Sequence, residues 1–252
     1  MGFAQDELSQ DGFLGGQLHI NQPKHGYRAA TDPVLLAASI QAAAGQTVLE
    51  LGCGVGVASL CLGRRIGGLS QTGVERQEDY ADLAARNAAE NGLELAVCRA
   101  DLVALPAEIL SQSFDHVIAN PPYLATGEGT PARDAGKEAA LREDTPLAQW
   151  LDVMIRRLKP GGMLGLIHLA ERLPDLLRGL DDRVGSIEVK PIAARRGRAA
   201  GRVLLRARKG ARGAFCLYAP LVMHQGDHHN GDGNSFNPEM QNVLRHGAAL
   251  RF

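Results

Sequence analysis

Short, mostly apolar runs alternate with longer mixed segments through the middle of the chain. Seven such runs have the length of strands, and most have the apolar composition of buried ones. They are residues 47–51, 71–75, 95–99, 114–119, 163–168, 185–192 and 202–208. The last two lie close enough along the chain to form an antiparallel hairpin that closes a sheet. The pattern predicts an α/β fold.

Helices are expected in the segments that separate these runs. The Ala-rich helix has a natural stop at Asn91-Gly92, because glycine favours the conformation that ends a helix. Thr31 or Asp32 is placed to cap an earlier helix whose first turn carries Pro33. The Ala-rich helix is expected over residues 79–92, and further helices are expected from residue 57 and over residues 146–158.

The chain divides into three parts on this interpretation. Residues 1–30 are expected to form an N-terminal arm that packs on the main domain, which covers residues 31–222. Residues 223–252 are expected to be a flexible loop and tail. Residues 124–145 are polar and rich in Gly, Ala and charge, which predicts an open substrate loop. The histidines at 226–239 stand among Gly, Asp and Asn, which favours a loop over a metal site.

Composition narrows the class of protein. The 252 residues are 45% hydrophobic, enough for one large domain with a substantial core. No window is apolar enough to predict a membrane span, and the first residues lack the pattern of a signal peptide. The four cysteines have no metal-type spacing. We expect a reduced, cytoplasmic protein without a metal, and a monomer is favoured over an oligomer.

A glycine-rich segment directly follows the first strand of the main domain. Residues 47–51 run into Gly52-Cys53-Gly54-Val55-Gly56, and glycines permit a tight turn and close approach to a ligand. The spacing differs from the dinucleotide pattern Gly-x-Gly-x-x-Gly. Glu50 stands two positions before the first glycine. This arrangement resembles the S-adenosylmethionine (SAM) binding loop of class I methyltransferases, in which an acid faces the cationic methionine end of SAM.

Two more acids end the next two strands. Glu75 lies roughly twenty residues beyond the glycine turn, the offset expected of a ribose-binding carboxylate. Asp101 follows the strand at 95–99, and the resemblance implies that it accepts a hydrogen bond from the adenine amino group of SAM. Either acid alone is more often a surface residue or a helix cap. Three acids at successive strand ends favour a nucleoside site, since open α/β sheets bind ligands there.

The tetrapeptide Asn120-Pro121-Pro122-Tyr123 ends the strand at 114–119. Its two prolines fix φ and remove two backbone donors, so a stiff elbow with free carbonyl acceptors is predicted. Tyr123 offers a flat ring on which a planar group can stack. Carbonyl acceptors beside a stacking ring suit a planar –NH2 group, which predicts methylation at nitrogen. As a structural feature alone, the segment is a strand followed by a rigid turn.

Basic residues concentrate between residues 183 and 212, where Glu188 is the single acid. Such a block suggests a polyanionic partner, although a solvated face is the usual alternative. Residues 195–202 are expected to form a mobile Gly- and Arg-rich hairpin tip that contacts phosphates. The proposed RNA contacts are Arg195, Arg196, Arg198 and Arg202.

Several segments together resemble the bacterial tRNA (adenine-N6)-methyltransferase family. They are the stretches Gly26-Tyr27-Arg28 and Thr31-Asp32-Pro33-Val34-Leu35-Leu36, the glycine turn, the elbow and residues 202–210. The resemblance implies a Rossmann-like class I SAM-dependent methyltransferase fold. That fold has a mainly parallel sheet of seven strands, an antiparallel C-terminal hairpin and helices on both faces. Residues 226–239 depart from the family pattern, and Phe236 stands where a tyrosine is expected.

The resemblance also implies a reaction and its site. The methyl group of SAM is expected to pass to the exocyclic N6 of adenosine in tRNA, next to the anticodon in the best-known members. The side-chain oxygen of Asn120 and the backbone oxygen of Pro121 would accept the two amino hydrogens, and Tyr123 would stack on a flipped-out base. Pro122 completes the catalytic elbow. SAM is expected to contact Thr31, Glu50, Gly52, Cys53, Gly54, Gly56, Glu75 and Asp101.

Three alternatives stay open at this point. A protein glutamine-N5 methyltransferase uses the same elbow but usually carries a helical domain before the SAM fold, where this chain has about thirty residues. An rRNA guanine-N2 methyltransferase usually has Phe in place of Tyr123. A non-catalytic SAM- or RNA-binding protein is disfavoured because Asn120, Glu75 and Asp101 are all present.

Overall fold

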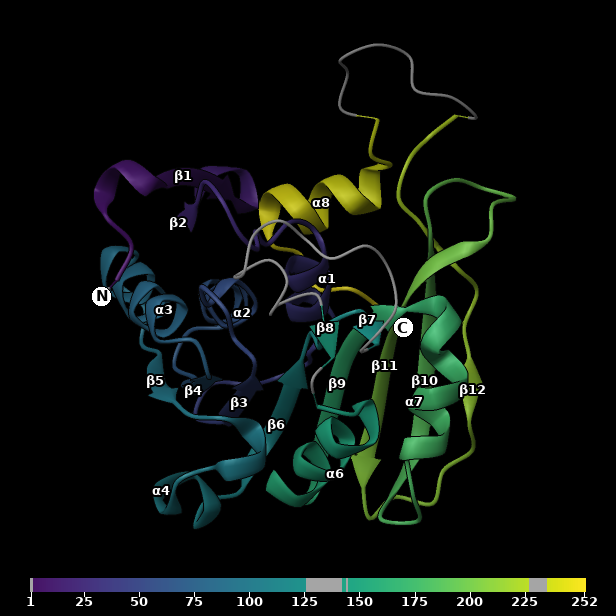
Figure 1. Ribbon diagram of the computed structural model, residues 1–252. Coiled ribbons are helices and arrows are strands. Elements are labelled where there is room, and N and C mark those ends of the chain that lie inside the picture. Colours follow the sequence, from purple (N-terminus) through teal and green to yellow (C-terminus); the bar gives the residue numbers. More distant parts are fainter. Residues whose placement is uncertain (1, 126–141, 144, 227–234) are drawn as a thin grey trace.

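A large mixed sheet forms the centre of the molecule (Figure 1). The computed structural model describes residues 2–125, 142–143, 145–226 and 235–252. Seven strands follow one another across the sheet in the order β5-β4-β3-β6-β9-β11-β10, and two-residue strands β12 and β13 extend it beside β10. Their bounds are β3 Thr47–Leu51, β4 Ser70–Glu75, β5 Ala96–Arg99, β6 Phe114–Ala119, β9 Leu158–Leu169, β10 Val184–Ala193, β11 Ala200–Lys209, β12 Cys216–Leu217 and β13 Leu221–Val222.

The strand directions match the fold class expected from the sequence. Strands β5, β4, β3, β6 and β9 are parallel, and β11 and β10 add an antiparallel hairpin at the β9 side. The predicted seven strands are therefore confirmed. β9 begins earlier than predicted, because residues 158–162 already continue from the preceding helix as strand.

The sheet separates two hydrophobic cores, because successive side chains of a strand point to opposite faces. Val48, Ile118, Ile167 and Leu204 pack into one core, together with the N-terminal arm and helices α1, α2, α3 and α8. The alternate strand positions pack into the second core, with α4, α6 and α7. These positions include Leu49, Val117, Leu166 and Leu205. Helices consequently cover both faces (Figure 1).

The four expected helices are present as α1, α2, α3 and α6, with ends shifted by at most two residues, whereas α4, α7 and α8 were not predicted. Their bounds are α1 Asp32–Ser39, α2 Val57–Arg65, α3 Glu78–Glu90, α4 Ala107–Leu110, α6 Leu147–Arg157, α7 Leu173–Gly179 and α8 Pro238–His246. α3 ends as predicted, with Asn91 at the C-cap and Gly92 at φ 62°. Neither Thr31 nor Asp32 caps α1 through its side chain. No helix among the described residues is long and apolar enough to cross a membrane.

The N-terminal arm is a small antiparallel sheet with short 3-10 turns. Strand β1 (Leu8–Phe13) pairs with β2 (Leu18–Pro23) across η2 (Leu14–Gly16), and η1 (Gln5–Glu7) precedes them. Leu18 and Ile20 of β2 are fully buried, because β2 packs on α2 and α3. The arm lies on the same side of the sheet as these helices (Figure 1).

The C-terminal segment differs from the flexible tail expected from the sequence. α8 packs against α1 and η2, and its Met240 and Val243 are buried at 0% and 1% exposure. Asn237 caps the helix by accepting a hydrogen bond from the Met240 amide. The prediction of a flexible tail is therefore wrong for residues 235–252, because apolar side chains at helical spacing fix them to the core. Residues 227–234 lie outside the described residues.

The predicted open loop at 124–145 falls largely on residues that the structure does not describe. Its two described ends form short strands, β7 (Leu124–Ala125) and β8 (Arg142–Glu143), which pair in parallel. The remaining η turns are η3 Leu102–Ala104 and η4 Ala170–Arg172, which follow β5 and β9.

One arginine of the basic block is a structural residue. Arg206 of β11 is 5% exposed and binds Glu188 of β10 through Nε and Nη2, at 3.1 and 2.7 Å. Its Nη1 donates to the Ser39 carbonyl, and the guanidinium lies 3.7 Å from the ring centroid of Phe252. This charge is accommodated inside the fold because every face of it has a partner.

We predict that Glu188→Gln lowers the free energy of unfolding by about 2 kcal/mol, because it leaves the buried Arg206 charge without its counter-ion. Chemical denaturation measures the change. Glu78→Gln is the matched control, since the Glu78–Arg99 pair is 47% and 59% exposed and is expected to cost less than about 1 kcal/mol. Equal losses in the two variants would contradict the structural role of Glu188.

Candidate functional site

A cavity opens at the carboxyl ends of the parallel strands. It is lined by the residues that follow β3, β4, β5 and β6, and also by side chains of the N-terminal arm and of α6. The three acids predicted from the sequence all line it, and so does the whole elbow. These residues are Glu50, Glu75, Asp101, Asn120, Pro121, Pro122 and Tyr123. The structure therefore brings together two groups of residues that the sequence separates by up to 73 positions.

The glycine turn connects β3 to α2 in a left-handed conformation. Gly52, Gly54 and Gly56 have φ values of 66°, 54° and 87°, which disfavour residues with a Cβ. At Gly52 a Cβ would also lie 2.8 Å from the Trp150 ring, so the turn requires glycine for space as well as for conformation. Cys53 lines the cavity, and burial raises the pKa of its thiol well above the usual value. The Cys53 thiol therefore lines the cavity in its neutral form.

Glu50 is a buried carboxyl group behind this turn. It is 3% exposed, and its Oε2 accepts hydrogen bonds from the amide and the hydroxyl of Ser59 in α2. Burial raises the pKa of Glu50 to about 7, while the bonds from Ser59 oppose that rise. A buried carboxyl group with a raised pKa favours a cation beside it, because a nearby positive charge stabilises the ionised form.

Glu75 ties the glycine turn to the end of β4. Its Oε2 accepts from the Gly54 amide at 3.0 Å, and its Oε1 accepts from the Gln77 amide at 2.9 Å. Asp101 occupies the equivalent place after β5, where its Oδ1 accepts from the Val103 amide at 3.1 Å and caps η3. Both carboxyl groups are thus oriented by backbone donors, and both face the cavity.

The elbow places the amide of Asn120 between two tyrosines. Its Oδ1 lies 2.9 Å from the hydroxyl oxygen of Tyr123, and its Nδ2 donates to the hydroxyl of Tyr27 at 3.4 Å. The Tyr123 hydroxyl also lies 2.5 Å from Oδ2 of Asp32, the first residue of α1. Burial, followed by the negative charge of Asp32, raises the pKa of Tyr27 to about 12, so this phenol stays neutral.

The ring of Tyr123 is held on several sides. The Arg202 guanidinium lies 4.7 Å from the ring centroid, and the His168 ring meets it edge-on at 5.3 Å. His168 Nε2 lies 3.2 Å from the Pro122 carbonyl, and its Nδ1 accepts from the Leu169 amide at 2.9 Å. These partners require the tautomer with the proton on Nε2. Burial lowers the pKa of His168 to about 4, which keeps the ring neutral.

The four proposed RNA contacts have different environments. Arg196 and Arg198 are exposed at the tip of the β10–β11 hairpin. Arg195 is 8% exposed and donates to the carbonyls of Gln225 and Gly226, so the expectation of an exposed tip is wrong at this position. Arg202 pairs with Asp32 at 3.1 Å and lies over the Tyr123 ring, so its guanidinium packs against the elbow and does not extend into solvent.

Thr31 precedes α1 but is not among the described residues that line the cavity. Its neighbours Ala29 and Pro33 do line it. A contact between Thr31 and SAM therefore stays a prediction. Among the described residues, no group of three or more His, Cys, Asp and Glu side chains is arranged to hold a metal ion.

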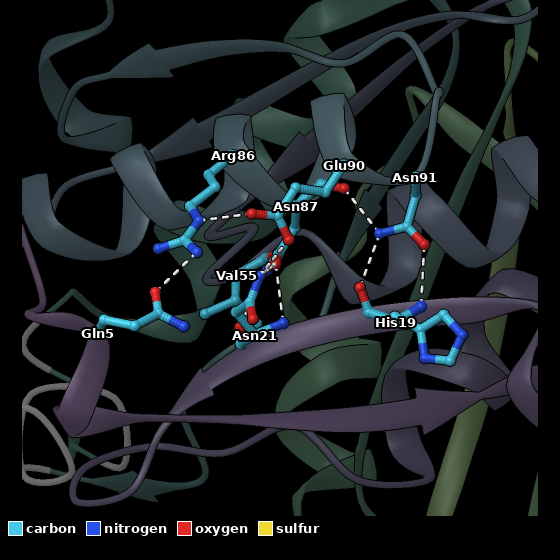
Figure 2. Close-up of polar contacts among 8 residues, drawn as sticks. All are labelled: Gln5, His19, Asn21, Val55, Arg86, Asn87, Glu90 and Asn91. Atoms are coloured by element: carbon cyan, nitrogen blue, oxygen red, sulfur yellow. Dashed lines mark hydrogen bonds and ion pairs between the residues drawn. The ribbon is translucent and has the colours of Figure 1, made fainter.

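The N-terminal arm reaches the glycine turn through α3 (Figure 2). Asn87 is fully buried; its Oδ1 accepts from the Asn21 amide at 2.8 Å, and its Nδ2 donates to the carbonyls of Asn21 and Val55. Asn91 makes a similar pair of bonds with the backbone of His19. One asparagine thus links the arm, the helix and the turn.

Sequence reasoning missed several residues of the site. Their contacts depend on positions that lie far apart along the chain. His168 alone had a usable signal, because it ends a predicted strand on the edge where the other strand ends form the cavity. The missed residues are Tyr27, Asp32, Tyr80, Asn87, Trp150 and His168.

We predict that lowering the pH destabilises the protein through His168. The unfolded histidine gains a proton near its usual pKa of 6.5, whereas the folded one resists protonation until about pH 4, so stability is lost as pH falls through this window. His168→Gln keeps a donor for Pro122 without titrating. The destabilisation caused by this variant, relative to wild type, should shrink by about 2 kcal/mol between pH 7 and pH 5.

The control is His25→Gln, since His25 is exposed. Thermal or denaturant unfolding at both pH values measures the difference. A destabilisation by His168→Gln that stays constant with pH would show that His168 is not held neutral.

Comparisons with known proteins agree with the fold. Residues 30–135 match the methyltransferase small domain family. A predicted O-methyltransferase from Agrobacterium tumefaciens has a TM-score of 0.69 at 25% identity, covering 87% of this chain and 98% of its own. The 16S rRNA N2 guanine methyltransferase of T. Thermophilus, solved with AdoMet and guanosine, has a TM-score of 0.56 at 20% identity over 80% of this chain and 50% of its own. This second likeness concerns the fold.

Two curated relatives share one name. The tRNA1(Val) (adenine(37)-N6)-methyltransferase of Actinobacillus succinogenes is 31% identical over 204 residues, which are 77% of this chain and 82% of the relative. Its namesake in Porphyromonas gingivalis is 32% identical over 178 residues, 67% of this chain and 69% of the relative. The glycine turn, the strand-end acids and the elbow all lie in one cavity of a class I methyltransferase fold. With these relatives, they show that the chain belongs to the tRNA1(Val) (adenine(37)-N6)-methyltransferase family.

Proposed function

We propose that the protein is a SAM-dependent methyltransferase that methylates the exocyclic N6 of adenosine in tRNA. The observation that carries this proposal is the position of Asn120 and Tyr123 in the same cavity as Glu50, Glu75 and Asp101. The proposed site for the methyl donor and the proposed site for a planar amino group therefore lie in the same cavity. The names of the relatives support tRNA as the substrate, and the cytoplasmic location and monomeric state stay predictions.

The residues around the glycine turn fit SAM. When bound, SAM supplies an electrophilic methyl group. The buried carboxyl group of Glu50 can face the cationic methionine end of SAM. Among the described residues, Glu50 has hydrogen bonds from Ser59 but no bond from a cation, and SAM would supply the positive charge. Glu75 is placed for ribose hydroxyls and Asp101 for an adenine amino group, at the ends of β4 and β5.

The elbow fits the methyl acceptor. The exocyclic nitrogen of adenine is a poor nucleophile, because its lone pair is delocalised into the ring. Oδ1 of Asn120 and the carbonyl of Pro121 accept its two hydrogens, which favours a pyramidal nitrogen and disperses the positive charge that develops there. The methylated nitrogen then loses one proton to water, so no general base is needed. Tyr123 provides the stacking surface for the flipped base.

The fold divides the basic block between two ends of the sheet. Arg202 of β11 pairs with Leu169 at the end of β9, on the same edge as the elbow, so the exposed Arg196 and Arg198 lie on the catalytic side. Arg208 pairs with Met163, about 20 Å farther along the strands. The arginines beside the cavity are therefore the ones suited to RNA phosphates next to a flipped base.

The test is methylation of bulk tRNA by purified protein with labelled SAM, using tRNA from cells without the enzyme. Nucleoside analysis is expected to find the label in N6-methyladenosine. Asn120→Ala should lower turnover at least about a hundredfold while SAM binding persists, because the oxygen that stabilises the positive charge developing on the amino nitrogen is lost. Exposed Asn242→Ala on α8 is the control and should leave turnover unchanged.

Label in N2-methylguanosine or in protein would overturn the proposed acceptor. Full turnover by Asn120→Ala would remove Asn120 from the reaction. Both outcomes are read from the same reaction mixtures.

We further predict that the double variant Arg196→Ala, Arg198→Ala binds tRNA more weakly. The slope of log K for binding against log salt concentration should become shallower by about two, roughly one unit per lost phosphate contact. Binding is measured by filter binding or fluorescence anisotropy over a range of salt concentrations. Arg208→Ala with Arg212→Ala is the matched control, because it removes the same charge from the opposite end of the hairpin. Equal slopes in the two double variants would show that the tip is ordinary solvated surface.

A further inference from the structure

The Tyr123 hydroxyl lies between two oxygen atoms that both accept hydrogen bonds. Asp32 Oδ2 is 2.5 Å away and Asn120 Oδ1 is 2.9 Å away. A phenol has one proton, so it can donate to one of these oxygens at a time. The acceptor that takes this proton decides whether the lone pairs of Asn120 are occupied or free.

Asp32 is the stronger of the two acceptors. A carboxylate accepts a shorter and stronger hydrogen bond than an amide oxygen, and here it is also the closer atom. Arg202 donates to the same Oδ2 at 3.1 Å, which holds the carboxylate beside Tyr123. The phenol proton is therefore directed at Asp32 and away from Asn120.

The other side of Asn120 is fixed by the N-terminal arm. Its Nδ2 donates to the Tyr27 hydroxyl at 3.4 Å, which leaves Oδ1 turned toward Tyr123 and the cavity. Oδ1 is the atom that the proposed reaction requires to accept a hydrogen from the substrate amino group. A phenol that donated to this oxygen would compete with the substrate for it.

We propose that Asp32 is a positioning residue that withdraws the Tyr123 proton and so leaves Asn120 Oδ1 available to the methyl acceptor. This inference rests on the proposed function and adds a residue from the start of α1 to its machinery. Asp32 is in the first turn of α1, where an acid also suits the helix dipole, but its side chain makes its described bonds to the elbow and to β11.

The experiment is a double-mutant cycle that combines Asp32→Asn and Tyr123→Phe. Asp32→Asn removes the charged acceptor, so the phenol turns to Asn120, and kcat for tRNA methylation should fall about tenfold with an unchanged KM for SAM. Tyr123→Phe keeps the stacking ring and removes the competing proton, so kcat should fall less than about threefold. In the Tyr123→Phe background, Asp32→Asn should lower kcat by less than about twofold.

The cycle separates proton withdrawal from simple anchoring. If Asp32 serves to hold Arg202 or the start of α1, its loss is as costly without the Tyr123 hydroxyl as with it, and additive effects overturn the inference. Arg202→Gln is the companion variant, since it removes the cation but keeps the carboxyl group. Its effect should persist in the Tyr123→Phe background, because the face of the ring is still uncovered.

A second readout needs no methyl acceptor. The Tyr123 hydroxyl proton should give a downfield NMR resonance that Tyr123→Phe abolishes and Asp32→Asn moves upfield. A resonance that stays in place in Asp32→Asn overturns the inference. Wild-type protein that fails to methylate tRNA adenosine overturns the proposed function instead, and the resonance still decides whether Asp32 takes the proton.

Discussion

The parallel pairing of β4, β3 and β6 is the constraint on which the site depends. Leu51 is in register with Val74 on one side and with Ala119 on the other, so all three strands end at the same edge. The glycine turn, Glu75 and the elbow begin within a few residues of those ends. Hydrogen bonds between strands therefore set the spacing between the glycine turn, Glu75 and the elbow.

Backbone donors then orient the acids that this register gathers. Glu75 accepts hydrogen bonds from the amides of Gly54 and Gln77. Asp101 accepts one from the Val103 amide, and Glu50 accepts one from the Ser59 amide. Such bonds fix each carboxyl group before a ligand arrives, which reduces the ordering that binding must provide. Fixing the carboxyl groups also limits the freedom of the glycine turn, whose sequence alone gives it little rigidity.

The elbow obtains its order from outside its own segment. Tyr27 comes from the arm, Asp32 from α1, His168 from β9 and Arg202 from β11, and each contacts Asn120, Pro122 or Tyr123. The prolines make the chain stiff, but they do not determine where the Asn120 amide or the Tyr123 ring points. The tertiary contacts also explain why the basic block is not one surface. Arg195 and Arg206 are buried, Arg202 belongs to the elbow, and Arg196 and Arg198 are left exposed.

The sequence by itself determined the strands, most of the described helices, the glycine turn and the acids and elbow that line the cavity. These features rest on local rules: period, length, the conformational freedom of glycine and the rigidity of proline. Only the tertiary structure decided the contacts of Asp32, which lies 91 positions from Tyr123 and 170 from Arg202. It also decided the burial of Arg195 and the packing of α8. The physical reason is that a hydrogen bond or an ion pair depends on distance in space, and local sequence patterns carry no information about contacts between segments so far apart.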